Sequence, residues 1–168
     1  MPESPSKPIA VGPFQLLRIA GSGATGTVWE AAFDTPHAAK PIQVAVKVLD
    51  QDLAREDRWL AAFRREVQAV AALDHPNIVT VFEHGRVSPE EARQSDGILQ
   101  SGSPFLAMEF LQGGTLTRRA GTLHWSDLRA VLLSLLDALA HAHARGVLHR
   151  DIKPGNVLLS PDTCVLSD

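Results

Sequence analysis

Cysteine is almost absent from this sequence, and its scarcity limits the chemistry of the chain. Cys164 is the only cysteine among 168 residues, so no disulfide can form within the chain. A reducing compartment is the simplest interpretation, and it points to the cytoplasm. Cys164 lies in the segment TCVLS without a basic neighbour that would make the thiol reactive. We therefore expect a buried structural thiol.

The sequence also lacks long hydrophobic runs, blocks of basic residues and internal repeats. Its most apolar stretch, 130–140, is too short to span a membrane and contains Asp137. The net charge of −3 gives no reason to expect nucleic acid or an anionic membrane as the main partner. The first ten residues, MPESPSKPIA, have no apolar signal-peptide core. We expect a disordered leader over 1–12.

Hydrophobic residues make up 45% of the sequence, which is enough to build a core. Glycines, Pro36 and β-branched residues predict three antiparallel strands between Phe14 and Val48. From 52 to 73, apolar residues recur at three- and four-residue spacing, which predicts an amphipathic helix with Glu66 on its inward face.

The second half predicts fewer strands and a longer helix. Strands are expected over 78–85 and 105–110, with a polar loop insertion over 88–103 between them. Ser126 is a candidate N-cap for a helix that runs to about Arg145. Gly146 is placed to end this helix, and short strands are expected over 157–159 and 164–166. The order predicts an α+β chain, with a sheet-rich lobe before the beginning of a helical one.

The segment GSGATGTV, Gly21 to Val28, matches the pattern G-x-G-x-x-G-x-V. Alone, this pattern also fits a flexible hairpin turn. A dinucleotide-binding fingerprint requires a helix after the glycines, whereas VWEAAF is strand-like, and a P-loop requires lysine where Thr27 stands. A glycine-rich hairpin has its own use, because residues without a Cβ let backbone N–H groups approach a polyphosphate.

Lys47, in the strand-like segment VAVK, is the candidate cation for such a phosphate. Strand alternation places Lys47 and Ala45 on one face. A single lysine on a strand is most often a solvated surface residue, but Glu66 follows at a distance suited to hold it. A lysine held by a carboxylate can act on phosphate oxygens as a fixed charge.

The segment HRDIKPGN is far more specific than the glycine loop. Asp151, Lys153 and Asn156 fall within six residues around Pro154, a spacing suited to a rigid loop. The carboxylate can orient a hydroxyl, the ammonium can neutralise a phosphoryl group, and the amide can ligate a hard cation.

With these motifs, the sequence from Phe14 to Asp168 resembles the protein kinase family. Lys153 resembles the serine/threonine branch, and MEFLQGGTL and HRDIKPGNVLL resemble its bacterial members. The resemblance implies a protein-kinase-like α+β fold, with an N-terminal lobe and hinge over 13–111 and the first part of a C-terminal lobe over 112–168. It implies phosphoryl transfer from ATP to Ser/Thr hydroxyls of proteins, with ATP and Mg²⁺ as cofactors.

The resemblance also assigns roles to individual residues. Lys47, held by Glu66, would position phosphates, and Asp151 and Lys153 would act on the transferred group. Asn156 and Asp168 would bind Mg²⁺. Met108 would be the gatekeeper of an adenine pocket. The other implied nucleotide-binding residues are Ala20, Gly21, Gly23, Gly26, Val28, Ala45, Glu109, Leu111 and Leu158.

Asp168 corresponds to the first residue of the family's D-F-G motif, so the resemblance implies that the activation loop and later helices are missing from these 168 residues. We expect the 168-residue chain alone to be inactive, with an uncovered apolar face on the helix after Ser126. The alternative is a non-catalytic nucleotide-binding or interaction module that keeps the ATP-facing residues.

Overall fold

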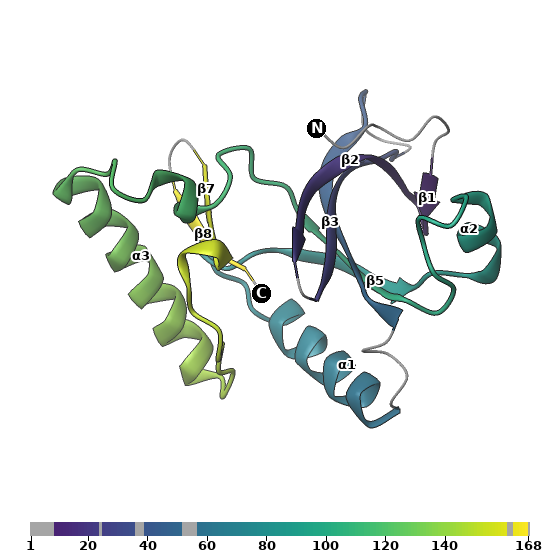
Figure 1. Cartoon of the computed structure of the whole chain (residues 1–168). Helices are drawn as coiled ribbons and strands as arrows, with labels where there is room; N and C mark the ends of the chain where they lie inside the picture. Colours follow the sequence, from purple (N-terminus) through teal and green to yellow (C-terminus); the bar gives the residue numbers. More distant parts are fainter. Residues whose placement is uncertain (1–8, 24, 36–38, 52–56, 161–162, 168) are drawn as a thin grey trace. The chain divides into compact units, whose positions relative to one another are not determined.

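The computed structural model describes residues 9–23, 25–35, 39–51, 57–160 and 163–167. The chain forms two compact units (Figure 1). Unit 1 comprises Met1–Val67 and Val81–Phe110, and unit 2 comprises Gln68–Thr80 and Leu111–Asp168. Gln68–Thr80, which the predicted boundary assigned to the first lobe, belongs to the second unit.

Unit 1 is built on a six-stranded antiparallel sheet with the strand order β1-β2-β3-β4-β6-β5. The strands are β1 (Ile9–Val11), β2 (Phe14–Gly23), β3 (Gly26–Phe33), β4 (Ile42–Leu49), β5 (Val81–Arg86) and β6 (Pro104–Glu109). The three strands predicted between Phe14 and Val48 are confirmed. β1 lies within the predicted disordered leader, and its alternating Ile9 and Val11 are buried, so the end of that leader is ordered.

The core of unit 1 lies on one face of this sheet. Alternation along β4 turns Val44, Val46 and Val48 toward the core and leaves Ala45 and Lys47 on the opposite face. The buried members of the core are Ile9, Val11, Phe14, Leu16, Trp29, Ala31, Val44, Val46, Val48, Val87, Leu99, Phe105 and Ala107. The aromatic rings add directional contacts, with the ring centroids of Phe14 and Phe105 6.4 Å apart.

The insertion over 88–103 is not a simple loop, because it contains the helix α2 (Pro89–Gln94). Ser88 caps this helix in a capping box: its hydroxyl accepts the N–H of Glu91, whose carboxylate accepts the N–H of Ser88. The same carboxylate accepts the N–H of Gly12 at 2.6 Å, so α2 is tied to the end of β1 (Figure 1). The signal was present in the sequence as Ser-Pro-x-Glu, but we expected a loop.

The helix α1 (Asp57–Ala71) corresponds to the amphipathic helix expected over 52–73. Residues 52–56 lie outside the described part of the chain. Leu60 and Val67 are buried, as the spacing predicts. Glu66 is exposed, so its predicted place on the inward face is wrong. The reason is physical: a carboxylate loses less free energy when water solvates it than when it is buried without a partner.

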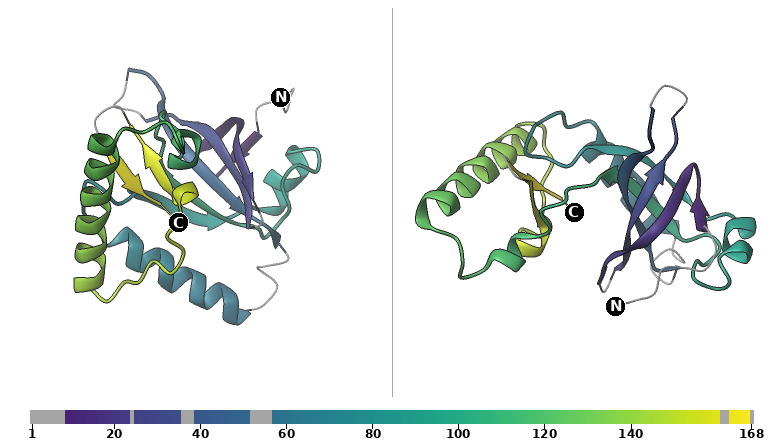
Figure 2. Two further views of the ribbon diagram at one scale, coloured as in Figure 1. Left: turned by 60° about the vertical axis from the view of Figure 1, so that its left-hand side comes forward. Right: turned by 90° about the horizontal axis from the view of Figure 1, so that it is seen from above.

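Unit 2 combines the helix α3 (Trp125–Ala144) with a two-stranded sheet of β7 (Val157–Leu159) and β8 (Cys164–Leu166), which lie side by side in Figure 2. Both strands were predicted with these bounds. Two short 3₁₀ helices, η2 (Leu116–Arg119) and η3 (Pro154–Asn156), complete the unit. Cys164 is buried as expected, and burial raises the pKa of its thiol.

The two ends of α3 differ in how well the sequence predicts them. The helix begins two residues before the predicted place, with His124 in the N-cap position, so Ser126 is already inside the first turn and the predicted cap is wrong. The end is confirmed. Gly146 has φ +76°, its N–H donates to the carbonyl of His143, and the N–H of Val147 donates to that of Ala142, which is the Schellman pattern.

One face of α3 is apolar and uncovered, as expected. Leu135, Ala138 and Ala142 are buried, whereas Leu132, Leu133 and Leu136 are exposed. None of the helices in the described part of the chain is long and apolar enough to cross a membrane.

Candidate active site

The glycine segment forms the turn of the β2–β3 hairpin, and strands continue on both sides of it. Gly21 pairs with Val28 and Gly23 with Gly26, so no helix follows the glycines. Gly26 has φ +143°, and a Cβ there would lie 2.1 Å from the carbonyl oxygen of Val48 on β4. Gly21 and Gly23 have open space instead, with no atom within 4 Å of the position of a Cβ. The hairpin therefore exposes backbone that a bulky ligand can approach.

Strand register brings four predicted nucleotide-binding residues onto one face of the unit 1 sheet. Val28 is the cross-strand partner of Lys47, and Ala45 is the partner of Met108. Directly opposed residues point to the same face, so all four lie on the side opposite Trp29 and the core. Ala45 and Met108 are buried and Lys47 is half-buried. This face places the apolar side chains of Val28, Ala45 and Met108 beside the ammonium group of Lys47.

The remaining predicted residues of unit 1 are placed less distinctively. Ala20 lies at an irregularity of the β2–β3 ladder, between Ile19 and Gly21, and is half-buried. Glu109 ends β6 opposite Val44. The carboxylate of Glu66 is exposed, so its predicted hold on Lys47 stays a prediction.

In unit 2, the loop between α3 and β7 is organised around Asp151. The ammonium of Lys153 donates to Asp151 Oδ2 at 2.6 Å. Asn156 Nδ2 donates to the carbonyl oxygen of Asp151 at 2.9 Å and to Oδ2 at 3.0 Å. The turn of η3 makes this possible, because Pro154 starts it and Asn156 N–H bonds back to the carbonyl of Lys153. The loop brings the three predicted catalytic and metal-binding side chains together.

These contacts favour the ionised form of the Asp151 carboxyl group. The hydrogen bond from Lys153 lowers the pKa of its carboxyl group, and the bond from Asn156 lowers it further. Arg150, the preceding residue, has a left-handed φ of +63°, which is strained for a side chain of its size. The loop therefore holds an exposed, ionised carboxylate in a backbone conformation that the chain does not adopt freely.

His149 connects this loop to the segment after β8. Its Nε2 lies 3.1 Å from the carbonyl oxygen of Ser167, and its Nδ1 accepts the N–H of Asp151 at 3.3 Å. Only the neutral tautomer with a proton on Nε2 satisfies both contacts. Ser167 in turn donates its N–H and its hydroxyl to the carbonyl of Asn156. The residue before Asp168 is therefore bonded to the loop that carries Asp151.

Comparison with known proteins shows the family. The model for the protein kinase domain matches residues 14–168. The chain belongs to the protein kinase family. It is 39% identical over 155 residues to the probable serine/threonine-protein kinase PknB of Bifidobacterium longum, covering 90% of this chain and 21% of that one. It is 33% identical over 151 residues to the serine/threonine-protein kinase PrkC of Bacillus subtilis, covering 88% and 21%.

A solved structure gives the same result for the fold. The kinase domain of Mycobacterium tuberculosis PknI has a TM-score of 0.71 and 28% sequence identity, and the match covers 99% of this chain and 61% of that one. The chain is the N-terminal part of a protein kinase domain, and it spans about a fifth of the length of those curated relatives.

The predicted kinase site residues are divided between the two units. Leu111 and Leu158 belong to unit 2, where both are half-buried. Leu158 forms an isolated bridge with Thr115. Asp168, the predicted second metal ligand, lies outside the described residues. Ser167 is the residue that sequence reasoning missed, and its only signal was its position next to Asp168.

Proposed function

We propose that this chain provides the nucleotide-binding lobe and the catalytic loop of a serine/threonine protein kinase. The reaction transfers the γ-phosphoryl group of ATP to a Ser or Thr hydroxyl of a protein substrate. The hydrogen-bond network of Asp151, Lys153 and Asn156 carries the proposal, because it combines a hydroxyl-orienting carboxylate with an ammonium and an amide in one loop. The lone Cys164 and the use of ATP favour the cytoplasm as its location.

ATP would bind as substrate on the face of unit 1 that carries Lys47. The exposed backbone of Gly21 and Gly23 would approach the phosphates, and Lys47 would neutralise them. Met108 would border the adenine as gatekeeper. The adenine would contact Ala20, Val28, Ala45, Leu158 and the backbone of Glu109 and Leu111.

Mg²⁺ is implied by the family, and the chemistry of Asn156 fits it. Both contacts of its Nδ2 are to oxygen acceptors, so the amide nitrogen must face Asp151 and Oδ1 must face away. An amide oxygen is a ligand that Mg²⁺ accepts, and Asp168 would supply a second oxygen. When bound, the ion would neutralise charge on the phosphate oxygens.

The proposed reaction assigns one task to each side chain of the loop. The substrate hydroxyl oxygen bonds to the γ-phosphorus, the bond from that phosphorus to the bridging oxygen breaks, and ADP leaves. Asp151 orients the hydroxyl and takes up its proton, which its ionised state allows. Lys153, 2.6 Å from Asp151, offsets the negative charge of the transferred group.

The test is phosphate transfer from radiolabelled ATP to a Ser/Thr peptide by the product of the complete gene. Asp151→Asn keeps the shape but removes the proton acceptor, so we expect kcat to fall by about 10²- to 10⁴-fold, with ATP binding retained. Asp127→Asn, on the exposed first turn of α3, is the matched control and should leave kcat unchanged. Equal rates for Asp151→Asn and the wild type would refute the assignment.

A non-catalytic nucleotide-binding module is the second candidate, and the exposure of Glu66 favours it. The complete protein would then bind Mg·ATP in calorimetry without transferring phosphate. For the 168 residues alone, we expect weak binding and no turnover.

A further inference from the structure

Two histidines of unit 2 lie against each other and have no role in the proposed reaction. His75 lies in the segment 73–79, between α1 and β5, and His141 lies near the end of α3. The centroids of their rings are 4.9 Å apart, and the ring planes are tilted by 48°. Both residues belong to unit 2, so their contact is a property of this unit alone. We call these two residues the histidine pair.

The hydrogen bonds of His75 select its neutral form. Its Nδ1 accepts the N–H of Asn77 at 3.1 Å, and its Nε2 lies 3.2 Å from Asp137 Oδ2 on α3. An imidazole that accepts at Nδ1 carries its proton on Nε2, so Nε2 donates to Asp137. A second proton would have to enter at Nδ1, where the N–H of Asn77 already points. Only 9% of the His75 side chain is exposed, so water cannot readily replace the lost bond.

The surroundings of His141 also oppose a positive charge. Its Nε2 is buried and has no hydrogen-bond partner among the described residues. Burial lowers the pKa of its imidazole, and repulsion from Arg145 and from His75 lowers the pKa further. The carboxylates of Asp137 and Asp74 act in the opposite direction but do not outweigh these effects. Protonation of His141 would therefore leave a buried N–H without an acceptor.

The segment that carries His75 is bonded to β8. The side chain of Asn77 donates to the carbonyl of Cys164 at 2.8 Å, and the N–H of Leu166 donates to the carbonyl of Asn77 at 2.9 Å. Ser167 follows β8 and is hydrogen-bonded to the loop between α3 and β7. Hydrogen bonds therefore connect the histidine pair, through β8, to the candidate catalytic loop.

We propose that the histidine pair is a pH-sensitive switch within unit 2. With both rings neutral, the pair holds the segment 73–79 against α3, and protonation of either ring loosens the segment. Two charged imidazoles at this distance also repel each other, so the second proton is opposed more than the first. The loosened segment supports β8, and with it the loop between α3 and β7, less firmly. The effect on phosphoryl transfer rests on the proposed function, whereas the loosening of the segment does not.

The lowered pKa of His141 determines the sign of the pH dependence. Histidine in an unfolded chain has a pKa of about 6.5. Because the pKa is lower in the folded state, this contribution to stability is fully present above about pH 6.5 and is lost as the pH falls through the folded-state pKa. Acid should therefore loosen the segment 73–79, and neutral pH should hold it in place.

The experiment measures amide hydrogen exchange by mass spectrometry in the product of the complete gene, without ATP or peptide substrate. Protection over 73–80 is compared between about pH 7.5 and about pH 5.5, after correction for the intrinsic pH dependence of exchange. We expect the wild type to lose protection by at least about threefold in acid. Protection over 163–167 should fall with it, because Asn77 is bonded to β8.

The double variant His75→Asn/His141→Phe should keep its protection in acid. An asparagine side chain at position 75 can accept the N–H of Asn77, as His75 Nδ1 does, but it has no group that titrates in this range. Phenylalanine at position 141 keeps an aromatic ring at that place and removes the buried nitrogen that has no partner.

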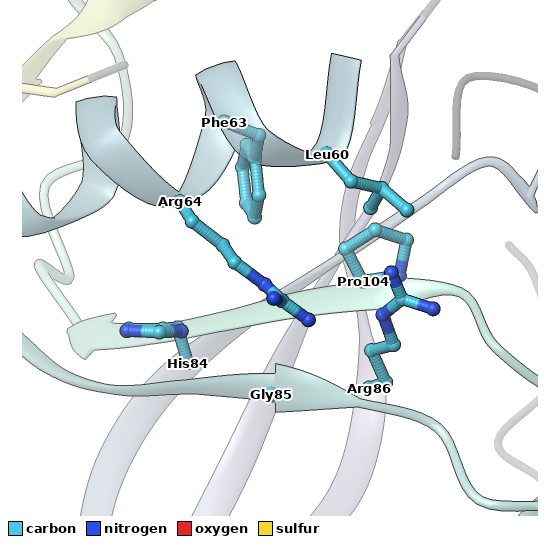
Figure 3. Close-up of a pocket in the computed structure, with 7 residues that line it drawn as sticks. All are labelled: Leu60, Phe63, Arg64, His84, Gly85, Arg86 and Pro104. Atoms are coloured by element: carbon cyan, nitrogen blue, oxygen red, sulfur yellow. The ribbon is translucent and has the colours of Figure 1, made fainter. Parts of the chain in front are cut away.

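Two control variants remove other histidines. His143→Gln changes an exposed residue of the same helix. His84→Gln changes a residue of unit 1 that lines a pocket between α1 and the strands β5 and β6 (Figure 3). Both variants should lose protection over 73–80 in acid as the wild type does.

The switch is refuted if wild-type protection over 73–80 is the same at both pH values, or if the double variant loses as much protection as the wild type. Circular dichroism at neutral pH checks that each variant folds. The single variant His141→Phe retains every hydrogen bond of His75, and an acid response equal to that of the wild type would refute the role of His141. Because no ATP is present, failure here leaves the proposed kinase activity untouched.

Discussion

The two units stabilise their functional segments in different ways. Among the described residues, unit 1 has a core cluster of thirteen buried residues on one face of its sheet, and the opposite face carries Lys47. In the described part of unit 2 there are two small clusters, one around Leu135 and Val157 and one around Ile78 and Ala138. The loop that carries Asp151 is held by hydrogen bonds that join Asp151 to Lys153 and Asn156.

This difference shows which interactions can position a site in each unit. In unit 1, packing fixes the strands, and strand register then fixes Lys47 and Ala45. In unit 2, a few polar contacts fix the loop, while α3 buries only Leu135, Ala138 and Ala142. Changes to packing should therefore affect unit 1 most, and changes to polar contacts should affect unit 2 most.

The largest expected effect is the loss of a core ring in unit 1. Phe105→Ala should lower the free energy of unfolding by about 3–5 kcal/mol, because it removes a buried aromatic ring that packs near Phe14. Denaturant unfolding measures the change, and amide hydrogen exchange should show the lost protection within unit 1. Phe82→Ala, on β5 with 52% of its side chain exposed, is the matched control. A similar loss in both variants would contradict the role of Phe105 in the core cluster of unit 1.

The next effect is the loss of a buried amide in unit 2. Asn77 Nδ2 donates to the carbonyl of Cys164 at 2.8 Å and to Thr163 Oγ1 at 2.9 Å. Asn77→Ala should lower the free energy of unfolding by about 1–3 kcal/mol, because the Cys164 carbonyl loses its shorter side-chain bond and keeps the longer one from the Thr163 hydroxyl at 3.3 Å. Thr163→Val removes the hydroxyl that accepts from Asn77 and donates to the Cys164 carbonyl at 3.3 Å, but it keeps the shorter bond from Asn77 to Cys164, so its effect should be smaller. Hydrogen exchange within unit 2 measures both, and equal effects would argue against the role of the Cys164 contact.

A smaller effect is expected at the capping box of α2. Burial alone would raise the pKa of Glu91, but hydrogen bonds from Ser88 and from the backbone of Gly12 outweigh it and lower the pKa below 4.5. Because the pKa is lower in the folded state, this contribution to stability is fully present above the pKa of the unfolded state. It is lost as the pH falls through the pKa of the folded state. Glu91→Gln should remove this pH dependence and lower stability at neutral pH by less than about 1 kcal/mol.

The control for this change is Glu90→Gln on the same helix. Glu90 accepts a hydrogen bond from Gln94 only, on an exposed surface. Thermal melting between pH 3 and 7 should show the wild-type slope in Glu90→Gln and a flatter slope in Glu91→Gln. The same slope in all three proteins would exclude a role for the Glu91 carboxylate in holding β1.

The smallest effect on stability is expected on the uncovered face of α3. Leu133 is 50% exposed, so Leu133→Gln should change the free energy of unfolding by no more than about 0.5 kcal/mol. It should reduce self-association, because it interrupts an exposed apolar patch. Light scattering and denaturant unfolding measure the two quantities. Leu135 lies two residues further along the helix and is buried, so Leu135→Gln should instead destabilise unit 2.

The sequence predicted the fold where one pattern determined the structure. Alternation along β4 predicted the shared face of Ala45 and Lys47, and Gly146 predicted the end of α3, because only a residue without a Cβ adopts its backbone conformation readily. It failed where two patterns competed. The polar insertion suggested a loop although Ser88 and Glu91 could form a capping box, and Ser126 suggested a cap although the helix begins before it.

The candidate site was predicted as a set of residues rather than as an arrangement. The spacing of Asp151, Lys153 and Asn156 indicated one loop, and the structure shows the hydrogen bonds between them. The orientation of Glu66 could not be predicted, because helical periodicity gives the position of a residue around the axis but not which faces the fold covers. The bonds of Ser167 to Asn156 depend on tertiary packing, and nothing local encodes them.

The three glycines of the β2–β3 turn are required for different reasons. At Gly26 an added methyl group would strike the carbonyl of Val48, so a substitution there tests folding. At Gly21 and Gly23 the space is empty, so alanine at either position should leave the hairpin intact and change only how closely the proposed nucleotide can come. A mutational library over this turn would accordingly separate two selective pressures, one from the chain's own architecture and one from its ligand.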